Sequence, residues 1–467
     1  MTTKEYDDLF LKPTLPLSVS LSREALTLSR PKSAKLSISI QDMLGCIAHC
    51  LPNKNFMPRL EIFYTVKQFK EYGKFGFAEL EDRQIKSLVV FGEDIGTLKA
   101  LRCDILDLVY RDQQINCKLK PDPHSLNPYY RRALVFVNPV SGKKKSEKVF
   151  HQYKHLFEAN GIFIELIKTT SRLFTQDYIR SLDKKKLLSF DLIICFSGDG
   201  IVHHILNGFY RRNDVDFAKE HLTVVLIPTG TGCALTENCM KSRGKMTSFS
   251  NVIHSICHGQ RKAFPVAKYE YLTDEKQKGS FYCFINLTHG YPCEVVLNSE
   301  KLRFLERKRI YIYGIYEYIF LKAYQTKVTF PLQEAGPMPP IEQEAVGNKY
   351  ITNSNPTSAI FVSELPYVAT EYRGFPLLLN KQIGVSNLHI IEKQLNRKDF
   401  LKFCIKHLNH EPGMEIGIVE ALKHSFRVEF DPDIEKRKIL VDGENYCDRG
   451  ARVVQKTNET FQFYSLI

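Results

Sequence analysis

Residues 191–200 read Asp-Leu-Ile-Ile-Cys-Phe-Ser-Gly-Asp-Gly, an uninterrupted apolar run that leads directly into a glycine-rich turn. The same pattern occurs at 133–142 (ALVFVNPVSG) and at 222–232 (LTVVLIPTGTG). Apolar runs of this length, separated by segments with helical periodicity, predict parallel strands buried beneath helices. The carboxyl ends of such strands line the ligand crevice, so we expect the three turns to lie at that crevice.

Helical periodicity separates these strands. Phe150 and Phe157 share one stripe of a predicted helix over 143–159, and a further strand is predicted at 162–167. The segment after the turn at 197–200 again has its apolar residues in helical phase. Alternation of strands and helices predicts an α/β domain, which we place at residues 130–262.

Residues 1–120 are predicted to form a separate unit. The predicted strands lie within 17–28, 35–40, 60–66 and 87–91. Leucine and isoleucine recur at helical spacing over 92–109. Several strands followed by one C-terminal helix resemble a pleckstrin-homology-like domain, a resemblance of pattern without a motif. The proline-containing stretch 118–128 is predicted to be the linker.

Strands predominate again over residues 263–467. The predicted strands are 268–272, 280–287, 325–330, 359–362, 388–393, 426–430, 439–441 and 461–466. They predict an antiparallel, β-sandwich-like domain, so the fold class is α/β plus β. The stretch 333–355 is rich in Pro, Gly, Glu and Asn, and we predict a mobile insertion there.

The composition narrows the class of protein. The 467 residues carry a net charge of +13, with 43% hydrophobic and 25% charged residues, as in soluble globular chains. The sequence contains no apolar run long enough to span a bilayer, and its start does not resemble a signal peptide. The 12 cysteines form no CxxC, so we expect a reducing, cytoplasmic location. Cys46 and Cys50 are interpreted as buried thiols, since no second ligand pair follows at zinc spacing.

The basic charge favours partners that carry phosphate. A nucleotide or an anionic membrane surface fits best, because no compact basic patch with interleaved aromatics indicates nucleic acid. Glycines at the three turns allow successive backbone N–H groups to face phosphate oxygens, and Lys143, Lys144 and Lys145 add positive charge beside the first turn. The pattern GxxxxGK[ST] is absent, which argues against a P-loop fold.

The three turns, taken together, resemble a known family. Asn138-Pro139…Gly142, Ser197–Gly200 and Pro228–Gly232 are similar to the ATP-site signatures of the diacylglycerol kinase catalytic family. Val441–Glu444 (VDGE) resembles a fourth family motif, and 290–303 is similar to the sphingosine kinase stretch that ends in ESEKYRR. The resemblance implies an ATP- and Mg²⁺-dependent kinase acting on a lipid alcohol, with the lipid held by the C-terminal β domain.

The resemblance also implies roles for individual residues. Asp199 would take the proton from a primary hydroxyl as it attacks the γ-phosphate of ATP. The nucleotide would be bound by Asn138, Pro139, Ser141, Gly142, Thr169, Ser197, Gly198, Gly200, Gly230, Thr231, Gly232, Arg303, Arg309, Asp442, Gly443 and Glu444. Of these, the two arginines would neutralise developing charge, and Asp442 would hold Mg²⁺ directly or through water.

The residues alone leave simpler interpretations open. Asp199 could cap the helix that follows it, since aspartate is a good capping residue. The charged run 303–309 could be a solvated helix face, and Asp442-Gly443 could be an ordinary hairpin turn. His203 and His204 have near-ligand spacing, but no acidic or cysteine partner in the sequence is placed to complete a metal site.

Three positions depart from the family pattern. His204 stands where the family usually has Glu, Cys233 where Asn is usual, and Ala267 where Asp or Asn is common. A non-catalytic, membrane-associated relative is therefore one alternative to an active kinase. A soluble nucleotide kinase such as an NAD kinase is another, although the VDGE and ESEK-like stretches argue against it.

The substrate is the least determined part of the prediction. Tyr291, Glu294 and Val296 are predicted to contact it. Val296 occupies the place of the aspartate that holds the polar head in sphingosine kinases, and Glu294 would supply a carboxylate on the same side if this segment is a strand. A sphingoid base is the preferred substrate, with ceramide or diacylglycerol as alternatives. We expect a peripheral membrane protein and leave a homodimer open.

An acyl chain needs an apolar slot in the protein. The segment 302–321 could line or gate this slot, and packing in an ordinary hydrophobic core is an equally good interpretation. Its apolar residues are Leu302, Leu305, Ile310, Ile312, Ile315, Ile319, Phe320 and Leu321.

Overall fold

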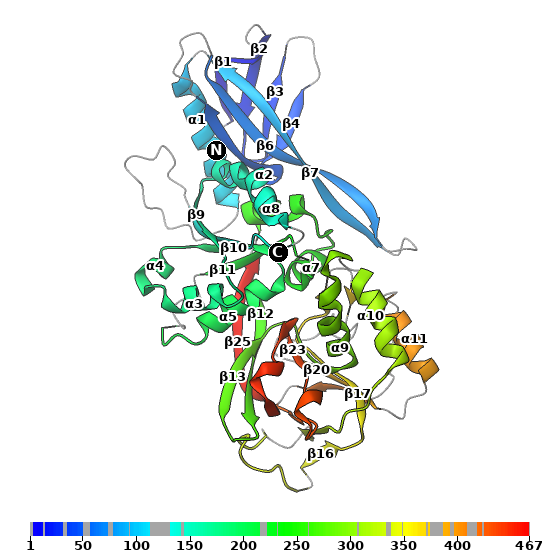
Figure 1. The fold of residues 1–467 in the computed structure, drawn as a ribbon. Coiled ribbons are helices and arrows are strands. Elements are labelled where there is room, and N and C mark those ends of the chain that lie inside the picture. Colours follow the sequence, from blue (N-terminus) through cyan, green and yellow to red (C-terminus); the bar gives the residue numbers. More distant parts are fainter. Residues whose placement is uncertain are drawn as a thin grey trace.

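The computed structural model describes most of the chain. The described residues are 3–12, 15–30, 35–49, 57–72, 78–92, 94–112, 131–141, 144–214, 222–230, 232–259, 261–305, 308–332, 338–347, 349–369, 372–373, 386–392, 397–408, 418–422 and 425–466. An N-terminal β unit, an α/β unit and a C-terminal β unit follow one another along the molecule (Figure 1). The predicted linker at 118–128 lies outside the described residues.

The N-terminal unit is an antiparallel sheet of seven strands in the order β4-β3-β2-β1-β7-β6-β5. The strands are β1 (Lys4–Lys12), β2 (Leu15–Leu21), β3 (Ala25–Ser29), β4 (Leu36–Ser39), β5 (Met43–His49), β6 (Arg59–Tyr72) and β7 (Ala78–Gly92). Helix α1 (Ile95–Asp112) buries Leu98, Leu101 and Ile105 against the sheet. Strands β2, β3, β4, β6 and β7 and the closing helix overlap the predicted segments, whereas β1 and β5 were not predicted. The pleckstrin-homology-like identity stays a prediction.

The stretch 17–28 forms two strands with a turn between them. Ser22 Oγ accepts the Ala25 N–H, and the Ser22 N–H donates to the Ala25 carbonyl at 3.0 Å, so this polar residue closes the hairpin.

Buried polar contacts dock this unit onto the α/β unit. His254 and His258 of α8 (Phe249–His258) bond through Nε2 to the carbonyls of Gln41 and Met43. Ser248 Oγ donates to Asp82 Oδ1 at 2.6 Å. The two units therefore share an ordered interface.

The α/β unit contains the predicted parallel strands. They lie in the order β11-β10-β8-β9 and are β8 (Arg131–Val137), β9 (Ile162–Lys168), β10 (Leu192–Ser197) and β11 (Thr223–Pro228). Its helices are α2 (Ser146–Ala159), α3 (Phe174–Ser181), α4 (Lys184–Leu188), α5 (Asp199–Phe209), α7 (Ala234–Lys241) and α8. All six residues of β10 are buried, as expected for a central strand covered on both faces.

One long strand joins this unit to the C-terminal unit. The end of β25 (Ala451–Leu466) pairs in parallel with β11, and most of its length pairs antiparallel with β12 (Arg261–Thr273). The sheet therefore continues past the predicted boundary at 262/263, and β25 crosses between the two units near the C-terminus (Figure 1). The pattern of apolar residues marked 461–466 as a strand but could not identify its neighbours.

Beyond β12 and β25, this sheet is extended by antiparallel strands. These are β13 (Lys278–Cys283), β15 (Lys327–Pro331), β16 (Tyr350–Asn353) and β22 (Arg427–Glu429). Strand β16 falls inside the stretch 333–355, where we predicted an insertion. Its pairing with β15 makes this part of the stretch regular structure, because the sheet edge offers it hydrogen-bond partners.

A second sheet faces the first across a shared core. Its order is β21-β20-β17-β14-β23-β24, with β14 (Asn286–Gly290), β17 (Thr357–Ser363), β20 (Ser386–Glu392), β21 (Ile418–Leu422), β23 (Ile439–Val441) and β24 (Glu444–Asn445). Tyr269 and Val428 from the first sheet and Ile360 and Leu388 from the second belong to one buried cluster. The remaining elements are β18 (Tyr367–Ala369), β19 (Tyr372–Arg373), α9 (Tyr291–Ser299), α10 (Lys308–Ile319) and α11 (Arg397–Leu408). The sandwich-like description stays a prediction.

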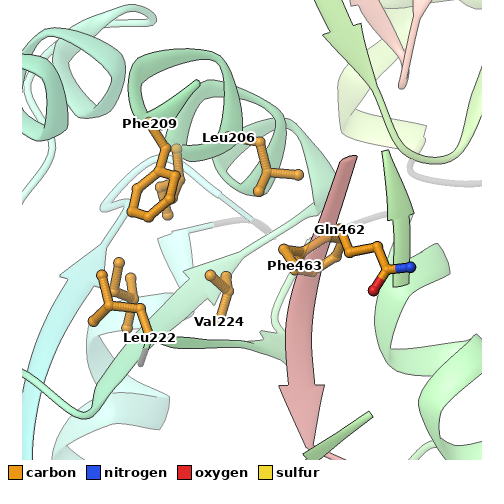
Figure 2. A pocket seen from close by; sticks show the side chains of 8 residues that line it. Leu206, Phe209, Leu222, Val224, Gln462 and Phe463 are labelled. Atoms are coloured by element: carbon orange, nitrogen blue, oxygen red, sulfur yellow. The ribbon is translucent and has the colours of Figure 1, made fainter. Parts of the chain in front are cut away.

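A small hollow lies between α5 and the sheet (Figure 2). It has a volume of about 20 Å³ and is lined by Leu206 and Phe209 of α5, Leu222 and Val224 at the start of β11, and Phe463 of β25. Ligand pockets usually measure about 300–1,000 Å³, so this apolar hollow is a packing gap in the core rather than a ligand site.

Candidate active site

The three glycine-rich turns contribute to one site at the carboxyl end of the parallel strands. The Gly230 N–H donates to the Ser197 carbonyl at 2.9 Å, and the Asn138 N–H donates to the Phe196 carbonyl at 3.2 Å. Asn138 Nδ2 lies 3.5 Å from Ser197 Oγ. The predicted convergence of the three turns is therefore present.

The turns approach so closely that glycine is required at their contact. A Cβ on Gly230 would lie 2.5 Å from the Gly198 Cα, and a Cβ on Gly198 would lie 3.0 Å from the Gly232 carbonyl oxygen. A side chain at Gly230 would force the two backbones apart. The absence of side chains leaves main-chain atoms as the lining, which fits the phosphate groups of a nucleotide.

Asp199 begins α5 directly beside this contact. Its Oδ2 accepts the Ala234 N–H at 2.7 Å and its Oδ1 accepts the Leu235 N–H at 3.0 Å, so the carboxylate caps α7 rather than its own helix. The side chain is 8% exposed. Burial raises the pKa of Asp199 to about 6, although the two backbone hydrogen bonds partly oppose this shift.

The departure at Cys233 bears directly on Asp199. Cys233 is the N-cap residue of α7, yet its side chain accepts no hydrogen bond from the helix. Asp199 instead accepts the first two amides of the helix, of which the Leu235 amide is one that an asparagine cap could bind. With Cys233 at the N-cap position, Asp199 caps α7.

Glu444 borders the cradle from the C-terminal unit. A Cβ on Gly200 would lie 2.1 Å from Glu444 Oε1, so β24 packs against the turn that carries Asp199. Arg172 Nε donates to Glu444 Oε2 at 2.9 Å, and His204 Nε2 lies 3.5 Å from the same oxygen. Burial alone would raise the pKa of Glu444, but His204 and Arg172 lower it to about 2.

Asp442 has a different environment from the one its predicted metal role requires. Its Oδ1 accepts N–H bonds from Phe284, Ile285 and Asn286, and its Oδ2 lies 2.8 Å from His203 Nδ1. The carboxylate side chain is fully buried. This arrangement does not support Mg²⁺ binding by Asp442, because its oxygens already hold the β13–β14 connection.

His203 extends this buried network. Its Nε2 lies 2.8 Å from the Tyr446 hydroxyl, and Asn207 Nδ2 donates to both the His203 carbonyl and the Tyr282 carbonyl. Among the described residues, no group of three or more His, Cys, Asp or Glu side chains is arranged to hold a metal ion. We therefore interpret His203 as a link between α5 and the C-terminal unit.

Other predicted nucleotide residues lie at the turns or outside the description. The Thr169 N–H donates to the Val137 carbonyl at 3.0 Å, and the Ser141 N–H donates to the Asn138 carbonyl at 3.1 Å, which places both residues at strand ends. Pro139 precedes Ser141 in the same turn, and Gly443 continues the turn of Asp442 with φ +80°. Gly142 and Thr231 lie outside the described residues.

The two arginines predicted to bind the nucleotide lie between α9 and α10 and on α10. Arg303 lies in the 3-10 helix η3 (Glu300–Leu305), and its side chain lies outside the described structure. Arg309 of α10 is buried and Nη1 donates to Glu300 Oε1 at 2.5 Å. No contact of Arg309 with the glycine turns appears among the described residues. Its predicted contact with the nucleotide stays a prediction.

The structure corrects the predicted role of the Glu294 carboxylate in binding the substrate. Glu294 lies on helix α9, not on a strand, so the argument from strand alternation is wrong. It is 3% exposed, and its oxygens receive Lys438 Nζ at 2.7 Å, Lys322 Nζ at 3.2 Å and the Tyr324 hydroxyl at 3.1 Å. Burial alone would raise the pKa of Glu294, but the two lysines lower it. A carboxylate already paired with two ammonium groups is not available for the amine of a substrate.

Tyr291 and Val296 lie on the same helix. The Tyr291 hydroxyl donates to the Gly314 carbonyl of α10 at 2.9 Å, and Val296 is half-buried. Ala267 lies in the core between the two sheets, opposite Cys283.

Sequence reasoning missed Arg172 and Tyr446 as residues of the site. Arg172 follows the end of β9 by four residues, so it lay in a region already expected to line the site.

Helix α10 carries an exposed apolar face beside this region. The exposed residues, each between 48% and 65% accessible, are Tyr311, Ile312, Ile315, Tyr316, Ile319 and the following Phe320. The predicted slot residues Ile312, Ile315, Ile319 and Phe320 thus face outward rather than into a core. Within the described part of the chain, no helix has both the length and the apolar character needed to cross a bilayer.

The chain is similar in sequence to known lipid kinases. Residues 132–269 match the diacylglycerol kinase catalytic domain. Sphingosine kinase 1 of Arabidopsis thaliana is 31% identical over 201 residues, which cover 43% of this chain and 40% of that protein. Sphingoid long chain base kinase 4 of Schizosaccharomyces pombe is 24% identical over 315 residues, covering 60% of this chain and 65% of that protein. The matches thus span less than two thirds of these relatives.

A solved diacylglycerol kinase from Bacillus anthracis aligns with 72% of this chain and 97% of its own, with 14% identity and a TM-score of 0.46.

Proposed function

We propose that this chain, a sphingosine kinase-like protein with a diacylglycerol kinase catalytic domain, transfers the γ-phosphate of ATP to the primary hydroxyl of a lipid. The observation that carries the proposal is the position of Asp199, a buried carboxylate at the edge of a main-chain cradle that only glycine can form. ATP supplies the phosphoryl group, and the divalent metal usual in this family would neutralise its charge.

The cradle fits the nucleotide better than it fits a metal ion. Its lining at Gly198, Gly230 and Gly232 is backbone, and a Cβ on Gly198 or Gly230 would crowd the facing turn. Of the predicted carboxylates, Asp199 and Glu444 lie beside these turns, whereas Asp442 is enclosed. Asp199 and Glu444 would hold a metal that accompanies the nucleotide, and the metal would neutralise phosphate charge.

Asp199 is the proposed general base. Its two oxygens are oriented by the Ala234 and Leu235 amides, and each oxygen keeps a further lone pair for the proton of a hydroxyl. Its pKa of about 6 is higher than that of an ordinary aspartate, so it accepts a proton more readily while remaining ionised at neutral pH. Positioning and proton transfer are the two contributions we assign to this residue.

A sphingoid base is the proposed acceptor. The support is similarity to proteins named sphingosine and sphingoid long chain base kinases. Since Val296 offers no carboxylate and Glu294 is paired with lysines, the recognition of an amine has to differ from our first prediction. Ceramide and diacylglycerol therefore stay as alternative acceptors.

We also propose that α10 contacts an anionic membrane. Its exposed apolar face lies beside Lys308 and Lys322, and buried apolar area together with basic residues gives reversible binding. A cytoplasmic protein that binds membranes peripherally accounts for these features.

The central test is the variant Asp199→Asn. Loss of a positioned base should lower transfer of labelled phosphate from ATP to sphingosine by about 10²–10⁴-fold. Asp177→Asn, which removes an exposed acid from the first turn of α3, is the matched control and should keep full activity. Thermal unfolding of both variants, measured alongside, separates loss of catalysis from loss of the α7 cap.

Wild-type turnover by Asp199→Asn would refute the assignment of the base. Nucleotide binding without transfer by the unaltered protein would favour the alternative, a non-catalytic membrane-associated relative in which His204 and Cys233 have ended turnover. A panel with sphingosine, ceramide, diacylglycerol and NAD as acceptors, read by product mobility, distinguishes the substrate classes.

A further inference from the structure

Two histidines of α8 join the N-terminal unit to the α/β unit. His254 Nε2 lies 2.8 Å from the Gln41 carbonyl oxygen, and His258 Nε2 is hydrogen bonded to the Met43 carbonyl. The two rings stack, with centroids 4.8 Å apart and an interplanar angle of 26°. Helix α8 packs against β5 and β7 of the N-terminal sheet and against β11 of the parallel sheet, so both contacts connect the two units (Figure 1).

These contacts favour the neutral form of the rings. A carbonyl oxygen only accepts, so each Nε2 carries a hydrogen and donates it, and in a neutral imidazole Nδ1 then has none. His254 is 7% exposed. Burial lowers the pKa of His254 well below its usual value, and His258 and Arg83 lower it further. The closed interface therefore disfavours a second proton on His254.

Positive charge already lies beside the histidines. Arg83 of β7 is buried, and its guanidinium is paired with Asp42 Oδ1 at 2.6 Å and with Glu81 Oε1 at 2.9 Å. Lys245, in the connection between α7 and α8, also disfavours the charged form of His254. A protonated His254 would thus meet two cations, while the two carboxylates are already paired with Arg83.

Other titratable groups on the elements packed against α8 have partners of their own. Asp82 Oδ1 accepts the Arg83 N–H at 2.8 Å and the hydroxyl of the N-cap serine of α8 at 2.6 Å. Glu237 and Lys241 of α7 lie 3.7 Å apart as an ion pair. Cys46 of β5 belongs to the core of the N-terminal unit, and β11 has no titratable side chain. These groups do not compensate a charge on the histidines.

We propose that His254 and His258 form an acid-sensitive latch between the N-terminal unit and α8. Each ring takes up one proton at Nδ1, and no covalent bond between heavy atoms is made or broken. Two stacked imidazolium rings next to Arg83 repel one another and are poorly solvated in the closed interface, so protonation favours the open interface. Closure is favoured above the ordinary histidine pKa of about 6.5 and is lost as the pH falls below it.

Opening of the latch would reach the proposed active site through the backbone. The Glu81 N–H donates to the Gly244 carbonyl at 3.0 Å, and the Met246 N–H donates to the Glu81 carbonyl at 2.9 Å, so β7 is paired with the connection between α7 and α8. Helix α7 in turn supplies the two amides that orient Asp199. The latch rests on the interface contacts and not on the proposed kinase activity, so either can fail without the other.

The test compares the full-length protein with the double variant His254→Gln/His258→Gln. Glutamine keeps an N–H donor for the same carbonyls but does not titrate. Small-angle X-ray scattering from pH 8 to pH 5, without nucleotide or lipid, should show a reversible increase in the radius of gyration of the wild type and a constant value for the double variant. Because two protons are taken up, the ratio of open to closed protein should rise by up to about 100-fold per pH unit.

His151→Gln is the matched control for this comparison. His151 is an exposed histidine of α2, and its variant should open as the wild type does. Far-UV circular dichroism at each pH verifies that all three proteins are folded. Opening of the double variant at the same pH as the wild type would overturn the proposal, and so would a wild type that stays closed to pH 5.

A second measurement needs only the wild type, so it decides the matter even if glutamine fails to close the interface. Hydrogen exchange of the Glu81 and Met246 amides, corrected for its intrinsic pH dependence, should be at least about tenfold faster at pH 5.5 than at pH 7.5. The amides of the central strand β10 should keep their protection. Unchanged protection of Glu81 and Met246 would contradict the latch.

Discussion

The turns at 197–200 and 441–444 each present a buried aspartate to main-chain amides, yet they differ in what surrounds it. Asp199 accepts the N–H groups of Ala234 and Leu235 and lies beside the close contact between the glycine turns. Asp442 accepts those of three consecutive residues beginning at Phe284 and also contacts His203, so it is enclosed. The same residue type therefore occupies the proposed reactive site in one turn and holds a chain connection in the other.

This difference shows that a buried, hydrogen-bonded carboxylate is not by itself a sign of chemistry. Their hydrogen-bond partners distinguish the two aspartates more clearly than burial does, since 8% of Asp199 and 4% of Asp442 is exposed. The pKa of Asp199 is raised because burial outweighs its two hydrogen bonds. The following variants test whether the two turns are separable in function.

The largest effect in this set is expected for Gly230→Ala. The new Cβ would lie 2.5 Å from the Gly198 Cα and would separate the two turns. Displacement of a reactive site by about 1 Å can cost on the order of 100-fold, and we expect such a loss in kcat/KM for ATP. Gly244→Ala is the control in the same unit: its Cβ meets nothing within 4 Å, so the left-handed backbone (φ +66°) should cost about 1 kcal/mol of stability without moving the turns. Unchanged ATP kinetics for Gly230→Ala would remove the cradle from the mechanism.

Asp442→Asn should mainly affect stability. Asparagine tolerates the left-handed backbone at this position (φ +52°), so the change tests the charged hydrogen bonds alone. Loss of hydrogen bonds to a charged group costs about 2 kcal/mol in the free energy of unfolding, measurable as a lower urea midpoint. Asp448→Asn, an exposed change nearby, is the control. An Asp442→Asn protein of normal stability but without turnover would restore Asp442 to the catalytic site.

The pH dependence of kcat/KM tests the role of Asp199 as a base. As a base, Asp199 acts only when ionised, and its pKa is about 6, so activity should fall as the pH drops through that value. At pH 5 kcat/KM should be about tenfold below its plateau. Burial lowers the pKa of His204, although the neighbouring Glu444 opposes this shift. A profile that stays flat to pH 5 in a protein that remains folded would contradict the assignment.

Gly443→Ala is expected to have the smallest effect. Gly443 has φ +80°, which an alanine adopts at a cost of about 1 kcal/mol, but nothing lies within 4 Å of the new Cβ. The melting temperature should fall by a few degrees while kcat/KM changes little. A loss of activity as large as that of Gly230→Ala would mean that both turns bind the nucleotide equally.

The α/β unit was largely predictable from the sequence. The predicted strands around 133–137, 192–197 and 223–228 are confirmed. They could be predicted because each is a run of apolar residues that is followed directly by a glycine-containing turn. The convergence of their turns follows from parallel pairing, which places all carboxyl ends at one edge. Local information was sufficient for this half of the site.

The C-terminal half was less predictable. The argument for Glu294 was conditional on a strand, but Pro292 lies in the first turn of helix α9, which begins directly after β14. The neutralisation of Glu294 depends on Lys438, which is 144 residues away. No local pattern indicates such a pairing, because the ammonium and carboxylate meet only after two sheets and a helix have packed.

The amino-acid order alone determined the glycine-rich turns and the aspartate among them, because strand propensity and the need for glycine act over neighbouring residues. Tertiary structure decided which amides each buried aspartate accepts and which carboxylate is paired with lysine, because charge compensation and burial depend on segments far apart in the chain.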